Sequence, residues 1–321
     1  MKHNFRYPFT VFTASYNRAH LLPRVCECLI KQTFKDFEWL IVDDGSTDNT
    51  REVVAQLSSK VGFRVRYVAK PNGGKPTAVN RAAKESQGLL IPILDSDDWY
   101  TPDALERFWH HWQNIPENLQ PGFVGVTALC CYPSGELIGD RFPQEVFDCD
   151  FIDLRYKHKV TGEKGGCVRT DVLRQYPYPE TLGKYVSESL VWNRIAKTYK
   201  TRFVNDVLTI KEFQPGGITR DGRYIQVRDT RASLLVAKEL IALGNRLPLK
   251  PRVRAYANYV RHSLHQGIPF GEQAAGVPSK AMLSLCYPIG VYLHSRDASL
   301  VAEKQRKVPQ QKQPVETPCK S

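Results

Sequence analysis

The sequence has no hydrophobic run long enough to cross a lipid bilayer. Its most apolar stretch, residues 282–293 (MLSLCYPIGVYL), has 12 residues and contains Pro288, whereas a spanning helix needs about 20. A secretory leader is also missing, because the first residues, MKHNFRYPFTVF, pass directly into a strand-like segment. These two absences predict a cytosolic protein, or one attached at most to the cytoplasmic face of a membrane.

The eight cysteines form no CxxC pair and show no spacing typical of metal ligands. Scattered thiols of this kind predict reduced cysteines in a reducing compartment. Internal repeats are absent as well. With 42% hydrophobic and 24% charged residues, the composition excludes a disordered chain and a collagen-like fibre and suffices for a full α/β core.

The net positive charge is small in the first two thirds of the chain and large in the last third. Residues 221–321 hold 16 Lys and Arg against 7 Asp and Glu, a net charge of +9 out of +12 for the whole chain. Such an excess suits anionic lipid, nucleic acid or an acidic substrate, and it also fits a solvated surface. Because this region has no helix-turn-helix signature and no interleaved aromatic and basic residues, no nucleic acid is expected as a partner.

Strand-like and helix-like segments alternate over the first 110 residues, which predicts a parallel sheet covered by helices on both faces. Strands are expected at 9–14, 37–42, 63–69 and 89–94, and helices at 19–33, 48–57, 77–86 and from 102. Further strands are expected at 123–131, 165–168 and 202–210, and helices at 190–198, 224–243 and 253–265.

Acidic residues follow two of these strands. Asp43 and Asp44 follow the second, and Asp95, Asp97 and Asp98 follow the fourth. Ligands bind at the carboxyl ends of strands in such sheets, and a DxD spacing lets one or two carboxylates hold a hard cation that in turn holds a diphosphate. A capping role for Asp98 at the next helix remains an alternative.

Tyr16 follows the first strand and lies beside the end of the second. Its ring can stack on a nucleobase while a neighbouring carboxylate accepts a hydrogen bond from the base or the ribose. Ordinary packing in a loop is an alternative explanation for this tyrosine.

Several spaced motifs give the chain a resemblance to the family 2 glycosyltransferases with the GT-A fold. They are TVFTASYNRAHLLPRVCECLIKQTFKDFEWLIVDDGSTDNT and NGGKPTAVNRAAKESQGLLIPILDSDDWYTPDAL. The match is dense over residues 9–110 and continues more loosely to about residue 220. It implies a Rossmann-like, mostly parallel sheet flanked by helices, with a helical C-terminal extension.

The resemblance also implies a donor site for a nucleotide sugar, with a uridine nucleotide favoured. The residues that would contact the donor are Thr13, Ala14, Tyr16, Asp43, Asp44, Lys75, Asn80, Asp95 and Ser96. Asp97 would bind a divalent metal, Mn²⁺ or Mg²⁺. A late loop, residues 216–219 (GGIT), would approach the diphosphate.

Members of the family use an acid in front of a helix as catalytic base, commonly a Glu-Asp pair followed by an Arg. In this chain Ser189 follows Glu188, so the pair is incomplete, but the spacing to Arg194 places Glu188 at the position of the base. A first-turn acid favoured by the helix dipole is the alternative.

The resemblance predicts three regions. Residues 1–222 would form the catalytic domain, with a nucleotide-sugar half (1–115) and an acceptor half (116–222). Residues 223–302 would be basic and helical, and residues 303–321 a disordered tail.

The predicted function is metal-dependent, inverting transfer of a sugar to a hydroxyl of a glycan or lipid-linked acceptor, in polysaccharide or glycoconjugate synthesis. A nucleotide-sugar-binding protein without catalysis is the alternative. The 282–293 segment combined with basic charge would suit contact with an anionic membrane, and packing in a core is equally compatible.

Overall fold

Four parallel strands form the first half of a nine-stranded sheet in the computed structural model, which describes residues 5–213, 227 and 229–307. The elements of this half are β1 (Tyr7–Ser15), η1 (Ala19–Leu21), α1 (Leu22–Ile30), β2 (Phe37–Asp43), α2 (Thr50–Ser58), β3 (Arg64–Ala69), α3 (Lys75–Glu85) and β4 (Gly88–Pro92). The strand order β3-β2-β1-β4 is parallel throughout. The strand-helix alternation predicted from the sequence is confirmed.

Burial explains why these segments form strands and helices. Every residue of β2 is buried, as expected for a strand covered on both faces. The helix expected at 19–33 begins instead as the 3₁₀ turn η1, and α1 buries Leu22, Val25 and Leu29 on one face. This is the helical spacing that the sequence showed.

The first half of the sheet is parallel as expected, and the second half is mixed. Its elements are β5 (Asp98–Tyr100), α4 (Ala104–Gln113), η2 (Gln120–Gly122), β6 (Phe123–Cys131), β7 (Val146–Cys149), α5 (Phe151–Tyr156), β8 (Lys164–Arg169), α6 (Thr170–Gln175), η3 (Glu180–Leu182), α7 (Glu188–Ile195) and β9 (Lys200–Lys211). β8 lies antiparallel between β4 and β6, and β9 pairs parallel with β6 but antiparallel with β5 and β7. The alternation of strands and helices in the sequence ends near residue 110, so it carried no information on these pairings.

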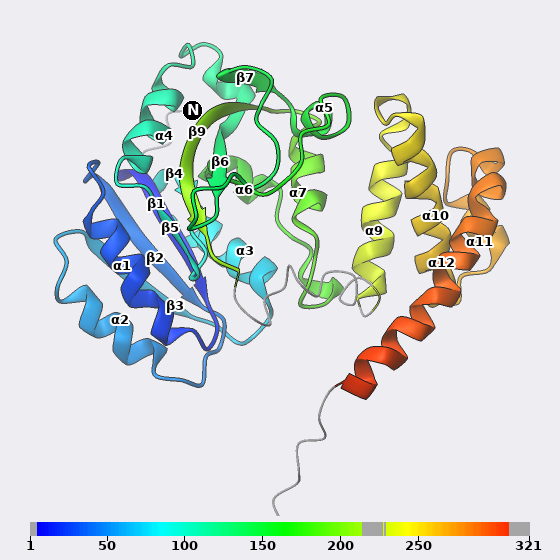
Figure 1. Cartoon of the computed structure of the whole chain (residues 1–321), viewed down its shortest axis with the longest axis horizontal. Helices are drawn as coiled ribbons and strands as arrows, with labels where there is room; N and C mark the ends of the chain where they lie inside the picture. The colour runs from blue at the N-terminus through cyan, green and yellow to red at the C-terminus, as the bar shows by residue number, and fades with distance from the viewer. Residues whose placement is uncertain (1–4, 214–226, 228, 308–321) are drawn as a thin grey trace, which may run out of the picture.

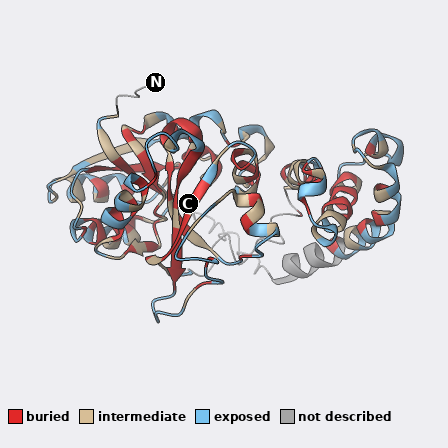
Figure 2. Ribbon diagram, turned by 90° about the horizontal axis from the view of Figure 1, so that it is seen from above, coloured by how far each residue is buried: buried red, intermediate tan, exposed pale blue. Residues whose placement is uncertain are grey.

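Two apolar layers enclose the sheet, and the buried residues run along its strands (Figure 2). One layer packs α1, α2 and α4 against the face that carries Trp39 and Val11. The other packs α3, α6 and α7 against the face that carries Phe12 and Leu40. These layers leave the loops at the strand ends free for polar side chains.

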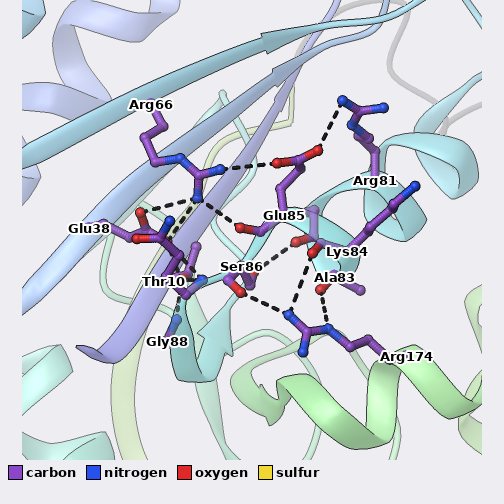
Figure 3. Close-up of polar contacts among 12 residues, drawn as sticks. Thr10, Glu38, Arg66, Arg81, Ala83, Lys84, Glu85, Ser86, Gly88 and Arg174 are labelled. Atoms are coloured by element: carbon purple, nitrogen blue, oxygen red, sulfur yellow. Dashed lines mark hydrogen bonds and ion pairs between the residues drawn. The ribbon is translucent and has the colours of Figure 1, made fainter. Parts of the chain in front are cut away.

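A buried polar network closes the amino ends of the parallel strands (Figure 3). Glu38 is fully buried, accepts a hydrogen bond from Thr10 Oγ1 at 2.7 Å and lies 3.3 Å from the Arg66 guanidinium. Arg66 also donates to the Glu85 carbonyl at 2.7 Å, while Arg174 donates to the Ala83 carbonyl at 2.8 Å. The network therefore ties β1, β2 and β3 to the end of α3.

Within the described residues, four α-helices follow the sheet, and the first of them, α9, packs against α7 (Figure 1). The elements are α9 (Thr230–Ile241), η4 (Gly244–Arg246), α10 (Leu249–His265), α11 (Phe270–Ala275) and α12 (Lys280–Lys307). Their own core includes Leu234, Tyr259 and Leu283 and reaches Ile152 of α5. A buried ion pair between Arg261 and Asp297 joins α10 to α12, with the Nε–Oδ2 distance at 2.6 Å.

Helix α12 extends further than the sequence predicted. Residues 303–307 are helical, so they do not belong to a disordered tail, and residues 308–321 lie outside the described part. Leu283 and Cys286 are buried, whereas Leu285, Ile289 and Tyr292 are exposed. The 282–293 segment thus packs on one face only. No described helix meets the length and hydropathy that crossing a membrane requires.

Candidate functional site

The carboxyl ends of β1, β2 and β3 meet at one edge of the sheet. Ser15, Asp43 and Ala69 are paired across these three strands. The loops that follow them therefore lie side by side. They are joined by hydrogen bonds such as that from the Asp44 amide to the Ser15 carbonyl, at 2.8 Å.

Asp44 organises the glycine-rich turn that precedes α3. Its carboxylate accepts hydrogen bonds from the amides of Gly73 and Gly74 at 2.9 and 2.7 Å, and it forms an ion pair with Lys70. Gly74 has φ of +86°, and a Cβ there would lie 2.1 Å from the Lys184 carbonyl oxygen, so only glycine fits. Because these donors already engage the Asp44 carboxylate, the structure gives it a positioning role in the turn.

The carboxylate of Asp43 is also engaged. It accepts from the Ser46 amide at 2.8 Å and from the Tyr67 hydroxyl. Burial, the hydrogen bond and the charge of Asp43 together raise the pKa of Tyr67 to about 12, so the phenol stays a donor. The two adjacent aspartates therefore hold the loops on either side of them.

Of the residues expected to line the nucleobase pocket, Tyr16 is the most accessible, with half of its surface exposed. The Thr13 side chain is buried, and its hydroxyl accepts the Trp39 indole N–H at 3.1 Å, so Thr13 can offer only its backbone. Asn17 holds the loop in a left-handed conformation, φ +53°, and accepts from the Thr47 amide at 2.7 Å. Ala14 is half-buried beside them.

The DSDD segment brings three carboxylates against three cations. Lys75 Nζ lies 2.9 Å from Asp95, Arg18 donates to Asp97 Oδ2 at 2.7 Å, and Lys211 Nζ lies 2.6 Å from Asp98 Oδ2. Asp98 begins the short strand β5, so its capping of a helix is ruled out. Ser96 is buried between these acids along the chain.

The charges of this cluster are strongly coupled. Burial opposes ionisation of Asp95, but the Lys75 and Lys211 ammonium groups outweigh it and lower the pKa of Asp95. Burial raises the pKa of Asp98 to about 7; the Lys211 ammonium opposes this shift, and the neighbouring Asp95 charge adds to it. Asp95 is therefore a fixed negative charge beside Lys75.

Lys75 joins the donor-side acids to the candidate base. Its Nζ is 3.2 Å from Glu188 Oε1 as well as 2.9 Å from Asp95 Oδ1. Burial disfavours the charged ammonium, but both carboxylates raise the pKa of Lys75 well above its usual value. Glu188 is the first residue of α7, and 59% of its side chain is exposed. The tertiary structure thus gathers Lys75, Asp95 and Glu188 from three separate segments.

Two other expected residues face elsewhere. The Asn80 amide is engaged with the backbone of Tyr178, donating to its carbonyl and accepting from its amide, both at 2.8 Å. This side chain anchors the segment before α7 and is not turned toward the donor site. Arg194 forms an ion pair with Glu239 of α9 at 2.6 Å, which fastens α7 to the C-terminal helices.

The carboxylates of Asp97 and Asp95 can supply part of the coordination shell of a divalent metal. Among the described residues, no three His, Cys, Asp or Glu side chains lie close enough together to hold a metal on their own. Mg²⁺ in nucleotide sites commonly takes one or two carboxylates and completes its shell with phosphate oxygens. Asp97 is one-fifth exposed at the end of its loop and suits that arrangement.

Sequence reasoning missed Arg18, Lys70 and Lys211, the cations that hold these acids. Arg18 follows the SYN motif directly, so its place at the strand end was visible in the sequence. Lys211 ends β9 and reaches Asp98 across 113 positions of chain, a contact that no local pattern reveals. The GGIT loop at 216–219 lies outside the described residues.

Solved structures share this fold over most of the chain. A *Staphylococcus aureus* TarS fragment (residues 1–349), crystallised with UDP-GlcNAc, matches with a TM-score of 0.58 and 17% identity, covering 92% of each chain. The *Pyrobaculum calidifontis* mannosyltransferase PcManGT, in complex with GDP-Man and Mn²⁺, matches at 0.51 and 19%, covering 96% of this chain and 89% of that one. The mixed sheet with its strand-end site is therefore the GT-A fold of glycosyltransferases.

Sequence comparisons identify a domain in the first part of the chain. Residues 10–125 match the model of glycosyl transferase family 2, so this segment is a family 2 glycosyltransferase domain. A chondroitin synthase of *Pasteurella multocida* (strain Pm70) is 42% identical over 148 residues, 44% of this chain. A hyaluronan synthase of *Pasteurella multocida* is 42% identical over 140 residues, 41% of this chain. The chain spans only 14% and 13% of the length of these two relatives.

Proposed function

We propose that the chain transfers a sugar from a nucleotide-diphosphate sugar to a hydroxyl of a glycan or lipid-linked acceptor. The observation that carries the proposal is the contact of Lys75 with both Asp95 and Glu188. Through these contacts Lys75 links Asp95, on the donor side, to Glu188, whose exposed carboxylate can serve as base. The relatives that synthesise chondroitin and hyaluronan support a role in polysaccharide synthesis.

The donor would lie across the carboxyl ends of β1, β2 and β4. Tyr16 would stack on the base, with the backbone of Thr13 and Ala14 beneath it. Asp43 and Asp44 would hold the loops around it, and the family resemblance favours a uridine nucleotide. Lys75 and Arg18 pair with Asp95 and Asp97 in this structure. The diphosphate of a bound donor would compete with these carboxylates for the two cations.

Glu188 would accept the proton of the acceptor hydroxyl as that oxygen attacks the anomeric carbon from the side opposite the diphosphate, which inverts the configuration. Lys75 would orient the Glu188 carboxylate through their contact at 3.2 Å. A divalent metal held by Asp97, with Asp95 beside it, would supply positive charge for the departing diphosphate. Asp95 would in addition hold Lys75 in place.

A panel of nucleotide sugars tests the proposal. Purified protein is incubated with each donor and Mn²⁺, and both thermal stabilisation and release of nucleoside diphosphate are measured. Stabilisation with release by at least one donor is expected. Stabilisation without any release, even by hydrolysis, would favour the alternative of a binding protein without catalysis. The incomplete acid pair at Glu188–Ser189 is the observation that favours this alternative.

The division of the chain into a catalytic part (1–222) and a basic helical part (223–302) is also proposed. The hydrophobic cluster of α9–α12 supports it, because most of its buried residues come from these helices. The ion pair of Arg194 with Glu239 and those of Arg246 with Asp150 and Asp153 join the two parts. Limited proteolysis, with mass spectrometry of the fragments, tests whether the two parts are cut from one another.

Contact with an anionic membrane is a second proposal, carried by the exposed stripe of α12. Leu285, Pro288, Ile289 and Tyr292 follow helical spacing on its outer face, and residues 221–321 carry +9. Apolar side chains combined with basic charge give reversible binding to anionic bilayers. Co-sedimentation should show binding to phosphatidylserine vesicles that salt weakens. Equal recovery in the supernatant with anionic and neutral vesicles would exclude it.

A further inference from the structure

Two exposed aromatic side chains lie together where β6 and β9 end. Tyr132 directly follows β6, and Phe213 lies two residues beyond the end of β9; these two strands are neighbours in the sheet (Figure 1). The ring centroids are 5.9 Å apart, and 36% of Tyr132 and 46% of Phe213 are exposed. The pair therefore offers apolar ring surface to solvent, together with the polar hydroxyl of Tyr132.

Lys211 connects the aromatic pair to the acids of the DSDD segment. It is the last residue of β9, and its Nζ lies 2.6 Å from Asp98 Oδ2 and 3.9 Å from Asp95 Oδ2. Phe213 follows Lys211 by two positions, and the Tyr132 ring lies beside the Phe213 ring. The aromatic pair is therefore only a few residues away from the acids around which the donor would be held.

The strand order separates this pair from the proposed nucleobase site. From β1, whose carboxyl end carries Tyr16, the sheet continues through β4 and β8 to β6 and then β9. Three strand spacings, about 14 Å, thus lie between β1 and β6. A nucleotide stacked on Tyr16 would leave the aromatic pair uncovered, with room between them for the diphosphate and the transferred sugar.

A carboxylate lies next to the same strand ends. Glu163 Oε2 is 3.3 Å from Lys211 Nζ, and 37% of the Glu163 side chain is exposed. The residue after it, Lys164, pairs with Leu129 of β6, which places Glu163 next to the last residues of that strand. Gly162, just before it, has φ of +84°, and a Cβ there would lie 2.5 Å from the Gly139 Cα, so the turn that carries Glu163 is closely packed.

Aromatic surface combined with a carboxylate suits a sugar ring. Sites for small polar ligands join apolar, often aromatic, surface to a few polar groups. A pyranose has a face of C–H groups that can pack on an aromatic ring, and its hydroxyls can donate to a carboxylate. We propose that Tyr132 and Phe213 form an acceptor subsite that packs on a pyranose ring, with Glu163 accepting hydrogen bonds from the hydroxyls of that ring. The assignment to the acceptor rests on the proposed transferase function.

Two measurements on the full chain test the subsite. Saturation-transfer NMR, without donor, measures binding of methyl β-glucoside and methyl N-acetyl-β-glucosaminide and reports which ring protons touch the protein. Release of nucleoside diphosphate from the active donor, at varied glycoside and donor concentrations, gives both KM values. Phe213→Ala and Tyr132→Ala remove the rings, whereas Phe213→Tyr and Tyr132→Phe keep them. Phe270→Ala is the matched control, because Phe270 is exposed to a similar extent, 44%, on α11.

At least one glycoside should bind the wild type, with the strongest saturation at the axial protons on one face of its ring. Each alanine variant should weaken glycoside binding about tenfold and leave the donor KM unchanged. The ring-keeping variants and Phe270→Ala should match the wild type. Absence of glycoside binding to the wild type, or unchanged binding by a Phe213→Ala protein with the wild-type circular dichroism, overturns the subsite. If glycosides bind as expected but no donor turns over, the transferase proposal fails and the sugar site stands.

Discussion

The parallel half of the sheet and the mixed half that follows hold their polar groups in different ways. In the parallel half, Asp44 contacts Lys70, Gly73 and Gly74, all within 30 positions of chain. In the mixed half, Lys211 contacts Asp98 and Glu188 contacts Lys75, each across 113 positions. The loops that would hold the nucleotide are therefore built locally, whereas the reacting centre is assembled from distant segments.

This difference assigns separate tasks to the two halves. The strand-end loops of β1 and β2 bond to each other through Asn17 and Thr47, and Asp44 bonds to the turn that follows β3. The Lys75 ammonium is the junction, because it faces Asp95 from the parallel half and Glu188 from α7. Variants on either side of this junction should then separate donor binding from the chemical step.

The largest effect is expected for Asp97→Ala, which removes the proposed metal ligand from the parallel half. Metal-dependent transfer should be lost, because little else at the loop would hold the cation against the diphosphate. Steady-state release of nucleoside diphosphate over a Mn²⁺ titration measures it. Asp36→Ala, at an exposed position, should match the wild type. Full activity of Asp97→Ala with Mn²⁺ would remove Asp97 from the metal site.

Glu188→Gln tests the mixed half. The amide cannot accept a proton, so kcat should fall by about 10² to 10⁴, while the donor dissociation constant changes little. Rapid-quench kinetics and donor titration by calorimetry separate the two quantities. Glu117→Gln, on an exposed loop, is the control. If kcat falls by less than about tenfold, another residue is the base, and Glu188 is an acid that the helix dipole favours at the start of α7.

Arg66→Met tests how much the buried polar network at the amino ends of the parallel strands contributes to stability. It leaves the Glu38 carboxylate buried without its cation, so the free energy of unfolding should fall by about 3 kcal/mol. Urea denaturation followed by circular dichroism measures the change. Arg64→Met, exposed on the same strand, should alter stability by less than about 0.5 kcal/mol. Equal stabilities of the two variants would show that the network in Figure 3 contributes little.

The smallest effect is expected for Tyr16→Ala. Loss of stacking on the nucleobase should weaken donor binding by about 1 to 3 kcal/mol, with kcat nearly unchanged. Donor KM and kcat are measured together, and Tyr16→Phe, which keeps the ring, should stay close to the wild type. An unchanged donor KM in Tyr16→Ala would mean that the base lies elsewhere along the strand ends.

The parallel half of the fold could be predicted because its signals are local. The buried run of β2 and the apolar spacing of α1 are periodic within a few residues, and both elements form as expected. The antiparallel place of β8 between β4 and β6 could not be predicted, since strand pairing depends on contacts far apart in sequence. Likewise, Asn80 matches a motif of the family, yet its amide bonds to Tyr178.

The sequence by itself determined the strand-helix alternation, the acids at the strand ends and the family resemblance, because each depends on residues a few positions apart. Only the tertiary structure decided which cation faces each acid. It also decided that Lys75 reaches Glu188. The physical reason is that ion pairs and cavity walls form between side chains that packing of the whole chain brings together.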